Sequence, residues 1–144
     1  MTALASPVNL APANLDCGPS LRTLAMPADA NPNGDIFGGW VVSQMDIAGG
    51  IVAVRRTKGR VATVGIETIS FHKPIWVGDE VNCFATIERT GRTSIRVRIE
   101  CWVRRLLSGE AHKVTEGVIT YVAVDDKGRP RLIENQPQPS SPNA

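Results

Sequence analysis

One carboxylate lies in the most apolar stretch of the sequence. Asp46 stands within residues 40–56, which are rich in valine, isoleucine and alanine and contain no other acid. Gly49 and Gly50 follow three and four residues later, on the same side of a helix. Because glycines inside a helix cost about 1 kcal/mol each relative to alanine, we expect them to leave room for a ligand's reactive group beside Asp46. The alternative is a structural carboxylate, with glycines that let a strand pack closely.

The residues before this stretch are suited to a turn followed by a helix start. Residues 31–34 read Asn-Pro-Asn-Gly, types that favour bends or a positive φ. Gly38 and Gly39 then lead into the apolar run. The helix predicted over residues 40–56 is apolar almost all round, which is typical of a helix buried on every side. Cations in its last turn and Gly59 beyond it mark the expected end.

Length and composition favour one globular domain. We predict a flexible arm over residues 1–19, a folded domain over 20–128, and a disordered, proline-rich tail over 129–144. The formal net charge of +2 is too small for a nucleic-acid binder, but it permits a local basic rim for a phosphorylated ligand. No run approaches the ~20 apolar residues of a membrane span. No secretory signal is visible either, so the expected location is the cytoplasm.

The cysteines and histidines suggest neither disulfides nor a metal site. Cys17, Cys83 and Cys101 have no CxxC spacing, and an odd count argues against a disulfide framework. Cys83 and Cys101 are expected to be buried thiols on strands. His72 and His112 have no carboxylate or cysteine at metal-ligand spacing. We therefore predict no metal.

The remaining patterns predict an α+β architecture. Apolar residues recur with strand periodicity between turn residues over residues 21–26, 61–71, 80–89, 93–105 and 112–124. Residues 61–71 are apolar on both faces, so this strand should be covered on both sides. Short turns imply antiparallel pairing, and a curved sheet wrapped around the one long buried helix would enclose it. Since that sheet cannot also protect its own edge strand, we expect a dimer that continues the sheet.

Six motifs on these elements resemble bacterial YciA-type acyl-CoA thioesterases of the hot-dog superfamily. In chain order they are Arg22-Thr-Leu-Ala-Met-Pro, Asn33-Gly-Asp-Ile-Phe-Gly-Gly-Trp40, Ser43-Gln-Met-Asp46, Lys73-Pro with Val77-Gly-Asp79, Gly91-Arg-Thr-Ser94, and Tyr121-Val-Ala-Val-Asp125. They cover the predicted folded part and leave out both ends. The resemblance implies the hot-dog fold, a curved antiparallel sheet around one long buried helix.

The resemblance also implies hydrolysis of acyl-CoA thioesters to a free carboxylic acid and coenzyme A. In such enzymes the helical aspartate, here Asp46, acts as general base on water or as nucleophile. The polar loop, here Asn33 and Asp35, lies across the active site from the aspartate of the partner subunit; related thioesterases often carry asparagine where this chain has Asp35. The implied assembly is a homodimer or a trimer of dimers. Coenzyme A is part of the substrate, so no separate cofactor, nucleic acid or membrane partner is expected.

Thioester cleavage needs few protein groups. The carbonyl is electrophilic and the thiolate leaves readily, so a carboxylate and donors for the developing oxyanion suffice. The free N–H groups of the first helical turn, at Gly39 and Trp40, are placed to supply those donors. Thr68 is a candidate to bond the water, with ordinary strand packing as the alternative.

The phosphates of coenzyme A require cations and backbone donors. Arg92, Thr93 and Ser94 form a predicted turn that offers a guanidinium, two hydroxyls and exposed amides. Lys73 and Arg60 are further candidates. A solvated surface position is the alternative for each of them.

Two other functions are compatible with the same pattern. A non-catalytic acyl-CoA binding or sensor protein would keep the pocket and release no thiol, but the sequence has no DNA-binding segment to act as its output. A hot-dog hydratase or dehydratase would need a proton-shuttling histidine, and the helix and its entry loop contain none. The sequence does not specify the acyl-chain length.

Overall fold

A computed structural model describes residues 18–134; the rest of the predicted arm and tail, residues 1–17 and 135–144, lies outside the described residues. The elements follow one another along the chain as β1 (Leu21–Leu24), the short 3-10 helix η3 (Pro27–Asp29), α2 (Gly38–Thr57), β2 (Val61–Phe71), β3 (Glu80–Thr90), β4 (Ser94–Arg104) and β5 (Ala111–Ala123). The strands and the long helix begin and end within about two residues of the predicted bounds.

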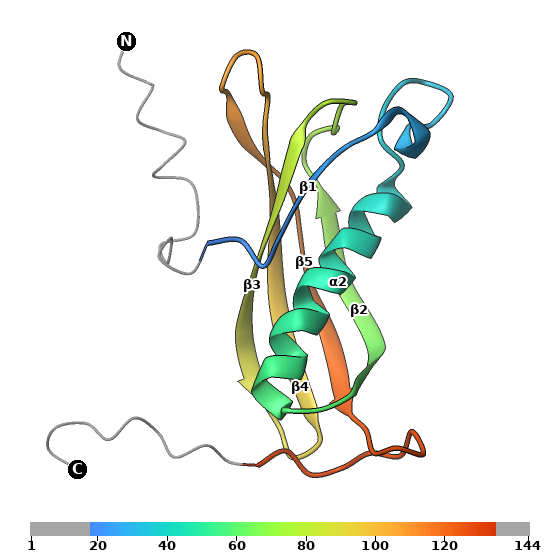
Figure 1. Cartoon of the computed structure of the whole chain (residues 1–144), viewed down its shortest axis with the longest axis vertical. Coiled ribbons are helices and arrows are strands. Elements are labelled where there is room, and N and C mark those ends of the chain that lie inside the picture. Colours follow the sequence, from blue (N-terminus) through green and yellow to red (C-terminus); the bar gives the residue numbers. More distant parts are fainter. Residues whose placement is uncertain (1–17, 135–144) are drawn as a thin grey trace, which may run out of the picture.

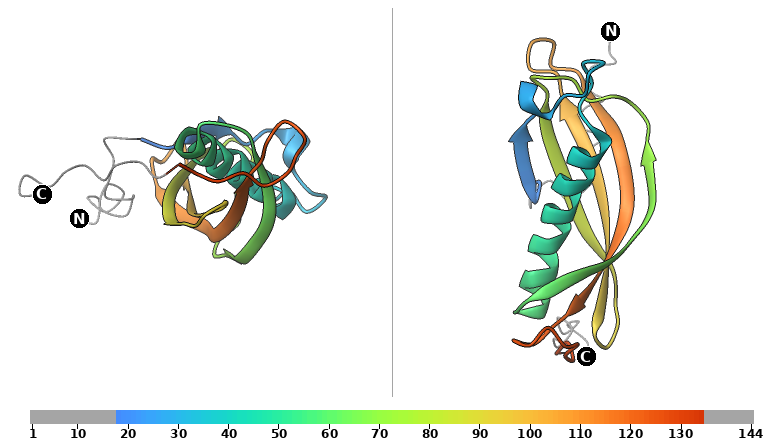
Figure 2. Two further views of the ribbon diagram at one scale, coloured as in Figure 1. Left: turned by 90° about the horizontal axis from the view of Figure 1, so that it is seen from below. Right: turned by 90° about the vertical axis from the view of Figure 1, so that its right-hand side faces the viewer.

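The strands form one antiparallel sheet in the order β1-β3-β4-β5-β2. The sheet curls around α2, which lies along its concave face (Figure 1, Figure 2). The predicted α+β architecture, a curved antiparallel sheet wrapped around one helix, is confirmed. Both β1 and β2 are edge strands, and β2 directly follows the helix in the chain.

The core lies between α2 and the concave face of the sheet. The alternation in β4 turns its fully buried residues toward the helix: Ile95, Val97, Ile99, Cys101 and Val103. Each buried aliphatic side chain of this size contributes roughly 1.5–3 kcal/mol relative to an exposed one. Cys83 lies opposite Cys101 on the neighbouring strand, and both are buried free thiols, as predicted.

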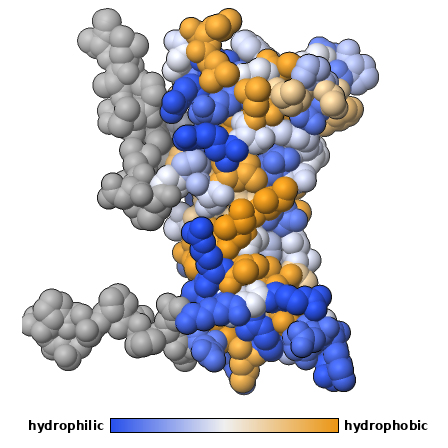
Figure 3. All heavy atoms as spheres, in the orientation of Figure 1, coloured by the Kyte–Doolittle hydropathy of each residue, from blue (hydrophilic) through white to orange (hydrophobic). Residues whose placement is uncertain are grey.

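A face of α2 and part of β2 remain uncovered in the single chain. Ile47, Ile51 and Val54 on the helix are 48%, 37% and 44% exposed, and Val64 and Ile66 on β2 are 59% and 46% exposed. We call these five residues the α2–β2 patch, and Figure 3 shows hydrophobic surface running across the middle of the molecule over α2. The predictions that the helix is buried on every side and that β2 is covered on both sides are therefore wrong for one chain, because one sheet covers only one side of the helix.

The ordered domain continues past residue 128. The N–H of Arg131 donates to the carbonyl of Ala123 at 2.9 Å. The N–H of Ile133 donates to the carbonyl of Arg92 at 2.8 Å. Ile133 is 7% exposed and packs into the core. Residues 129–134 thus belong to the packed domain rather than to the predicted tail. Within residues 18–134 no helix is long and apolar enough to cross a membrane.

Candidate active site

Asp46 lies near the middle of α2, between the packed face of the helix and the uncovered one. Its side chain is partly exposed, and the hydroxyl of Thr63 on β2 donates to Asp46 Oδ1 at 2.8 Å. Within residues 18–134 the carboxylate forms no ion pair. Thr63 therefore orients one carboxylate oxygen and leaves Oδ2 for a ligand or water.

Tyr121 explains the glycine that follows Asp46 by one helical turn. Its hydroxyl on β5 donates to the backbone carbonyl of Asp46 at 2.9 Å, and a Cβ added at Gly49 would clash with that hydroxyl. The space at Gly49 is thus filled by the sheet, and the prediction that a ligand occupies it is wrong. Burial raises the pKa of Tyr121 well above its usual value, with the nearby charge of Asp46 as a second cause, so the phenol remains a neutral donor.

The loop before α2 is held in shape by one side chain. Asn31 Oδ1 accepts hydrogen bonds from the backbone N–H groups of Asn33 at 2.9 Å and Asp35 at 3.1 Å. The N–H of Ile36 donates to the carbonyl of Ile75 at 2.9 Å, which fastens the loop to the segment after β2. Asn33 is exposed, whereas Asp35 is partly buried and lines a pocket beside the helix start.

The first turn of α2 offers accessible backbone donors. The amides at the start of a helix have no intrahelical acceptor, and a Cβ added at Gly39 would meet no atom within 4 Å, so a ligand can approach its backbone. The amide of Trp40 instead donates to the carbonyl of Phe37 at 3.1 Å, so its predicted use as an oxyanion donor is wrong. The Gly39 amide points out of the helix N-terminus, away from Asp46, which lies about 10 Å further along the axis. Gly39 and Asp46 of one chain therefore do not converge on one carbonyl group.

Thr68 does not reach Asp46 in the same chain. It lies in the irregular pairing between Glu67 and Ser70, is exposed, and has a φ of 54°. Along β2 it is about 16 Å beyond Thr63, the residue that bonds the carboxylate. The sequence interpretation missed Thr63, because only the packing of β2 against the helix identifies which threonine faces Asp46.

The predicted phosphate-binding residues lie at two ends of the molecule. Thr93 and Arg60 accept backbone hydrogen bonds from the consecutive residues 123 and 124, which brings the Arg92-Thr93-Ser94 turn beside the C-terminal end of α2 (Figure 1). Lys73 lies at the other end, beside the helix start.

A basic end surrounds that turn. The cations on the segments that meet there are Arg55, Arg56, Lys58, Arg60, Arg92, Lys127, Arg129 and Arg131. The acidic residues on the same segments are Asp125, Asp126 and Glu134, of which Asp125 pairs with Arg129 at 3.4 Å. Figure 3 shows hydrophilic surface gathered at this end. The excess of positive charge suits a phosphorylated group.

A long helix on the concave face of a curved antiparallel sheet, with a carboxylate at mid-helix and an accessible amide at Gly39, fits the class of hot-dog thioesterases. Residues 33–106 match the model of the thioesterase superfamily. Over 116 residues the chain is 52% identical to acyl-CoA thioester hydrolase YciA of Escherichia coli, covering 78% of this chain and 88% of that protein.

Solved structures agree. A hexameric broad-specificity acyl-coenzyme A thioesterase, solved with an aspartate changed to alanine, is 50% identical with a TM-score of 0.80, over 82% of this chain and 87% of the other. The hexameric hotdog fold thioesterase of Campylobacter jejuni is 37% identical with a TM-score of 0.78, over 81% and 90% of the two chains. The chain belongs to the thioesterase superfamily, in its YciA-like branch, and the resemblance drawn from the six motifs is confirmed.

Proposed function

We propose that this protein is an acyl-CoA thioester hydrolase in which Asp46 acts on the thioester. Asp46 either removes a proton from water as that water attacks the carbonyl carbon, or attacks the carbon itself. When water is the nucleophile, the tetrahedral intermediate expels the coenzyme A thiolate, which takes up a proton, and the carboxylic acid remains. When Asp46 is the nucleophile, loss of the thiolate leaves a mixed anhydride with Asp46, and water then cleaves it to the carboxylic acid and the free Asp46 carboxylate. The observation that carries the proposal is a carboxylate without an ion-pair partner among residues 18–134, oriented by Thr63 at the edge of an uncovered apolar face.

The oxyanion site is proposed to come from a second copy of the chain. The amide of Gly39 points away from Asp46 of its own chain, so a carbonyl held by that amide needs an aspartate from elsewhere. The α2–β2 patch supports such an assembly, because contiguous exposed apolar surface next to an edge strand favours association. The assembly is a homodimer, and three dimers would form the hexamer described for the relatives. Asn33 and Asp35 would then face Asp46 of the partner subunit.

The basic end is proposed to bind the phosphates of coenzyme A. Arg92, with Thr93 and Ser94, supplies a guanidinium, hydroxyls and turn amides, and Arg60 lies beside them. Lys73 belongs to the opposite end and would contribute only to a site completed by another subunit.

Replacing Asp46 by asparagine tests the proposal. Asp46→Asn keeps the shape and the Thr63 hydrogen bond but removes the base, so kcat should fall at least ~100-fold while coenzyme A binding and Tm stay near wild type. A thiol-release assay over a panel of acyl-CoAs measures the change. Asp35→Asn is the matched carboxylate-to-amide control and should retain activity, since related thioesterases carry asparagine there.

Three results would contradict the proposal. Turnover of Asp46→Asn at the wild-type rate would remove Asp46 from the chemistry. Tight binding of acyl-CoA by the wild type without any thiol release would favour the acyl-CoA binding or sensor protein instead. Hydration of enoyl-CoA without thiol release would favour the hydratase, although the pocket histidine, His72, is already bonded to Glu116 at 2.8 Å.

A further inference from the structure

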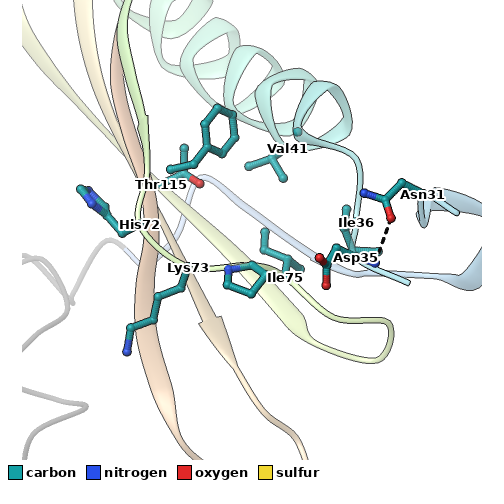
Figure 4. Close-up of a pocket in the computed structure, with 11 residues that line it drawn as sticks. Asn31, Asp35, Ile36, Val41, His72, Lys73, Ile75 and Thr115 are labelled. Carbon is teal, nitrogen blue, oxygen red and sulfur yellow. Dashed lines mark hydrogen bonds between the residues drawn. The ribbon is translucent and has the colours of Figure 1, made fainter. Parts of the chain in front are cut away.

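A pocket of about 330 Å³ opens beside the N-terminal end of α2. It lies between the entry loop, the first turn of the helix, the segment after β2, and β5 (Figure 4). Its apolar lining includes Ile36, Val41, Phe71 and Ile75, and Gly38 of the first helical turn borders it. A thioester carbonyl held at the helix start would therefore direct one of its substituents into this pocket.

A buried hydroxyl lines the pocket without a partner. Thr115 of β5 is 1% exposed, and its Oγ1 has no hydrogen-bond partner within residues 18–134. The pairing of β4 with β5 slips by one residue next to Thr115, and such bulges re-aim side chains. Thr115 pairs with the core residue Cys101, so it faces the helix side of the sheet, and Figure 4 shows its oxygen on the side of Val41. Since an unpaired buried hydroxyl lowers stability, its presence points to a ligand that supplies the missing partner.

The charges around the pocket disfavour an anionic ligand group. Asp35 contributes a carboxylate to the lining. The ammonium of Lys73 lies 3.4 Å from His112 Nδ1 and extends away from the other labelled residues (Figure 4). The ring of His72 bonds Glu116 at 2.8 Å. The β5 side of the pocket thus presents the neutral hydroxyl of Thr115, and the side of the entry loop presents the carboxylate of Asp35.

We infer that this pocket receives the acyl chain of the substrate and that Thr115 selects short acyl groups carrying a neutral hydroxyl or keto oxygen. The inference rests on the proposed hydrolase function. The volume of about 330 Å³ lies at the small end of ligand pockets, which fits a short chain. The hydroxyl of Thr115 can donate to either kind of oxygen, whereas a terminal carboxylate would be repelled by Asp35.

The test compares kcat/KM for 3-hydroxybutyryl-CoA, butyryl-CoA and succinyl-CoA. The wild type should favour 3-hydroxybutyryl-CoA over butyryl-CoA by about fivefold, the typical contribution of one neutral hydrogen bond, and should be slowest with succinyl-CoA. Thr115→Val has nearly the same shape and should bring the first ratio to about one. Thr115→Ser keeps the hydroxyl and should keep the preference. The Tm of Thr115→Val should not fall, because the variant loses a hydroxyl that has no partner within residues 18–134.

The outcomes separate this inference from the proposed function. A wild-type ratio near one, or the same ratio in Thr115→Val and the wild type, would overturn the selectivity while thiol release from butyryl-CoA leaves the hydrolase function intact. Absence of thiol release from all three substrates in the wild type would count against the hydrolase function itself. If Thr115→Val does not fold, Thr115→Ala removes the same hydroxyl and should likewise bring the ratio to about one, whereas an unchanged ratio would overturn the selectivity.

Discussion

The two faces of α2 carry residues of similar polarity but have different surroundings. The inward face, which includes Val41, Met45 and Ala48, is at most 2% exposed and packs on the sheet of its own chain. The outward face presents Ile47 and Ile51 to solvent. Asp46 lies between the two faces. One chain thus completes the fold, whereas the face that adjoins the carboxylate stays exposed in the single chain and is the face that we propose a second copy covers.

Introducing a charge on the outward face should have the largest effect. Ile51→Asp places a carboxylate in the α2–β2 patch, and burying it in a subunit interface without a partner is strongly unfavourable. We expect the assembly to dissociate and thiol release to fall at least ~100-fold, while each chain keeps its secondary structure, because a site shared between subunits loses its oxyanion donors. Light scattering, circular dichroism and the thiol-release assay measure these changes.

The control for that variant is a charge at an exposed apolar position outside the patch. Leu107, in the loop between β4 and β5, is fully exposed and lies outside both the patch and the basic end, so Leu107→Asp should leave assembly and activity unchanged. An active, monomeric Ile51→Asp protein would show that the outward face is not needed for catalysis.

Substitutions on the inward face should change the free energy of unfolding rather than the assembly of subunits. Gly49→Ala drives a methyl group into the Tyr121 hydroxyl, and overpacking of this kind costs about 1–3 kcal/mol of unfolding free energy. Gly50→Ala is the matched control: its Cβ would meet Tyr121 at an ordinary 3.9 Å, and the better helix propensity should stabilise by up to about 1 kcal/mol. Chemical denaturation of both variants measures the difference.

Removing the hydroxyl sharpens that result. A Tyr121→Phe background removes the closest of the contacts at Gly49 and leaves ring carbons at 3.1 Å, so Gly49→Ala should cost less than it does in the wild type. Equal costs in the two backgrounds would mean that Tyr121 is not the reason for the glycine.

The smallest effect on activity is expected from substitutions at the basic end, next to the C-terminal end of α2. Arg92→Gln should raise KM several-fold for acyl-CoA but not for acyl-pantetheine, which lacks the nucleotide phosphates, and the difference should shrink at high salt. Arg96→Gln is the control, because Arg96 pairs with Glu67 and Glu88 on the outer face of the sheet. An equal rise in KM for both substrates would place the phosphates elsewhere.

The sequence predicted those features that depend on local pattern. Periodicity and turn residues gave the strands, the helix and the position of Asp46, because side-chain period and backbone preference act over neighbouring residues. Features that depend on strand register were missed. Gly49 meets Tyr121 far along the chain, Thr63 rather than Thr68 bonds Asp46, and a slip in the β4–β5 pairing buries Thr115. The exposure of the outward face was also missed, since an apolar helix pattern does not distinguish burial by the same chain from burial by a partner.

The most direct test of the shared site is complementation between two inactive variants. Gly39→Pro removes the amide N–H, and proline is tolerated in the first helical turn; Gly39→Ala keeps the N–H and should remain active. Gly39→Pro and Asp46→Asn should each be inactive alone. After unfolding, mixing and refolding, activity should return to about one quarter of the wild-type level, because half of randomly paired dimers are mixed and each has one intact site. A mixture as inactive as its two components, with mixed dimers present, would contradict a site built from Asp46 of one subunit and Gly39 of the other.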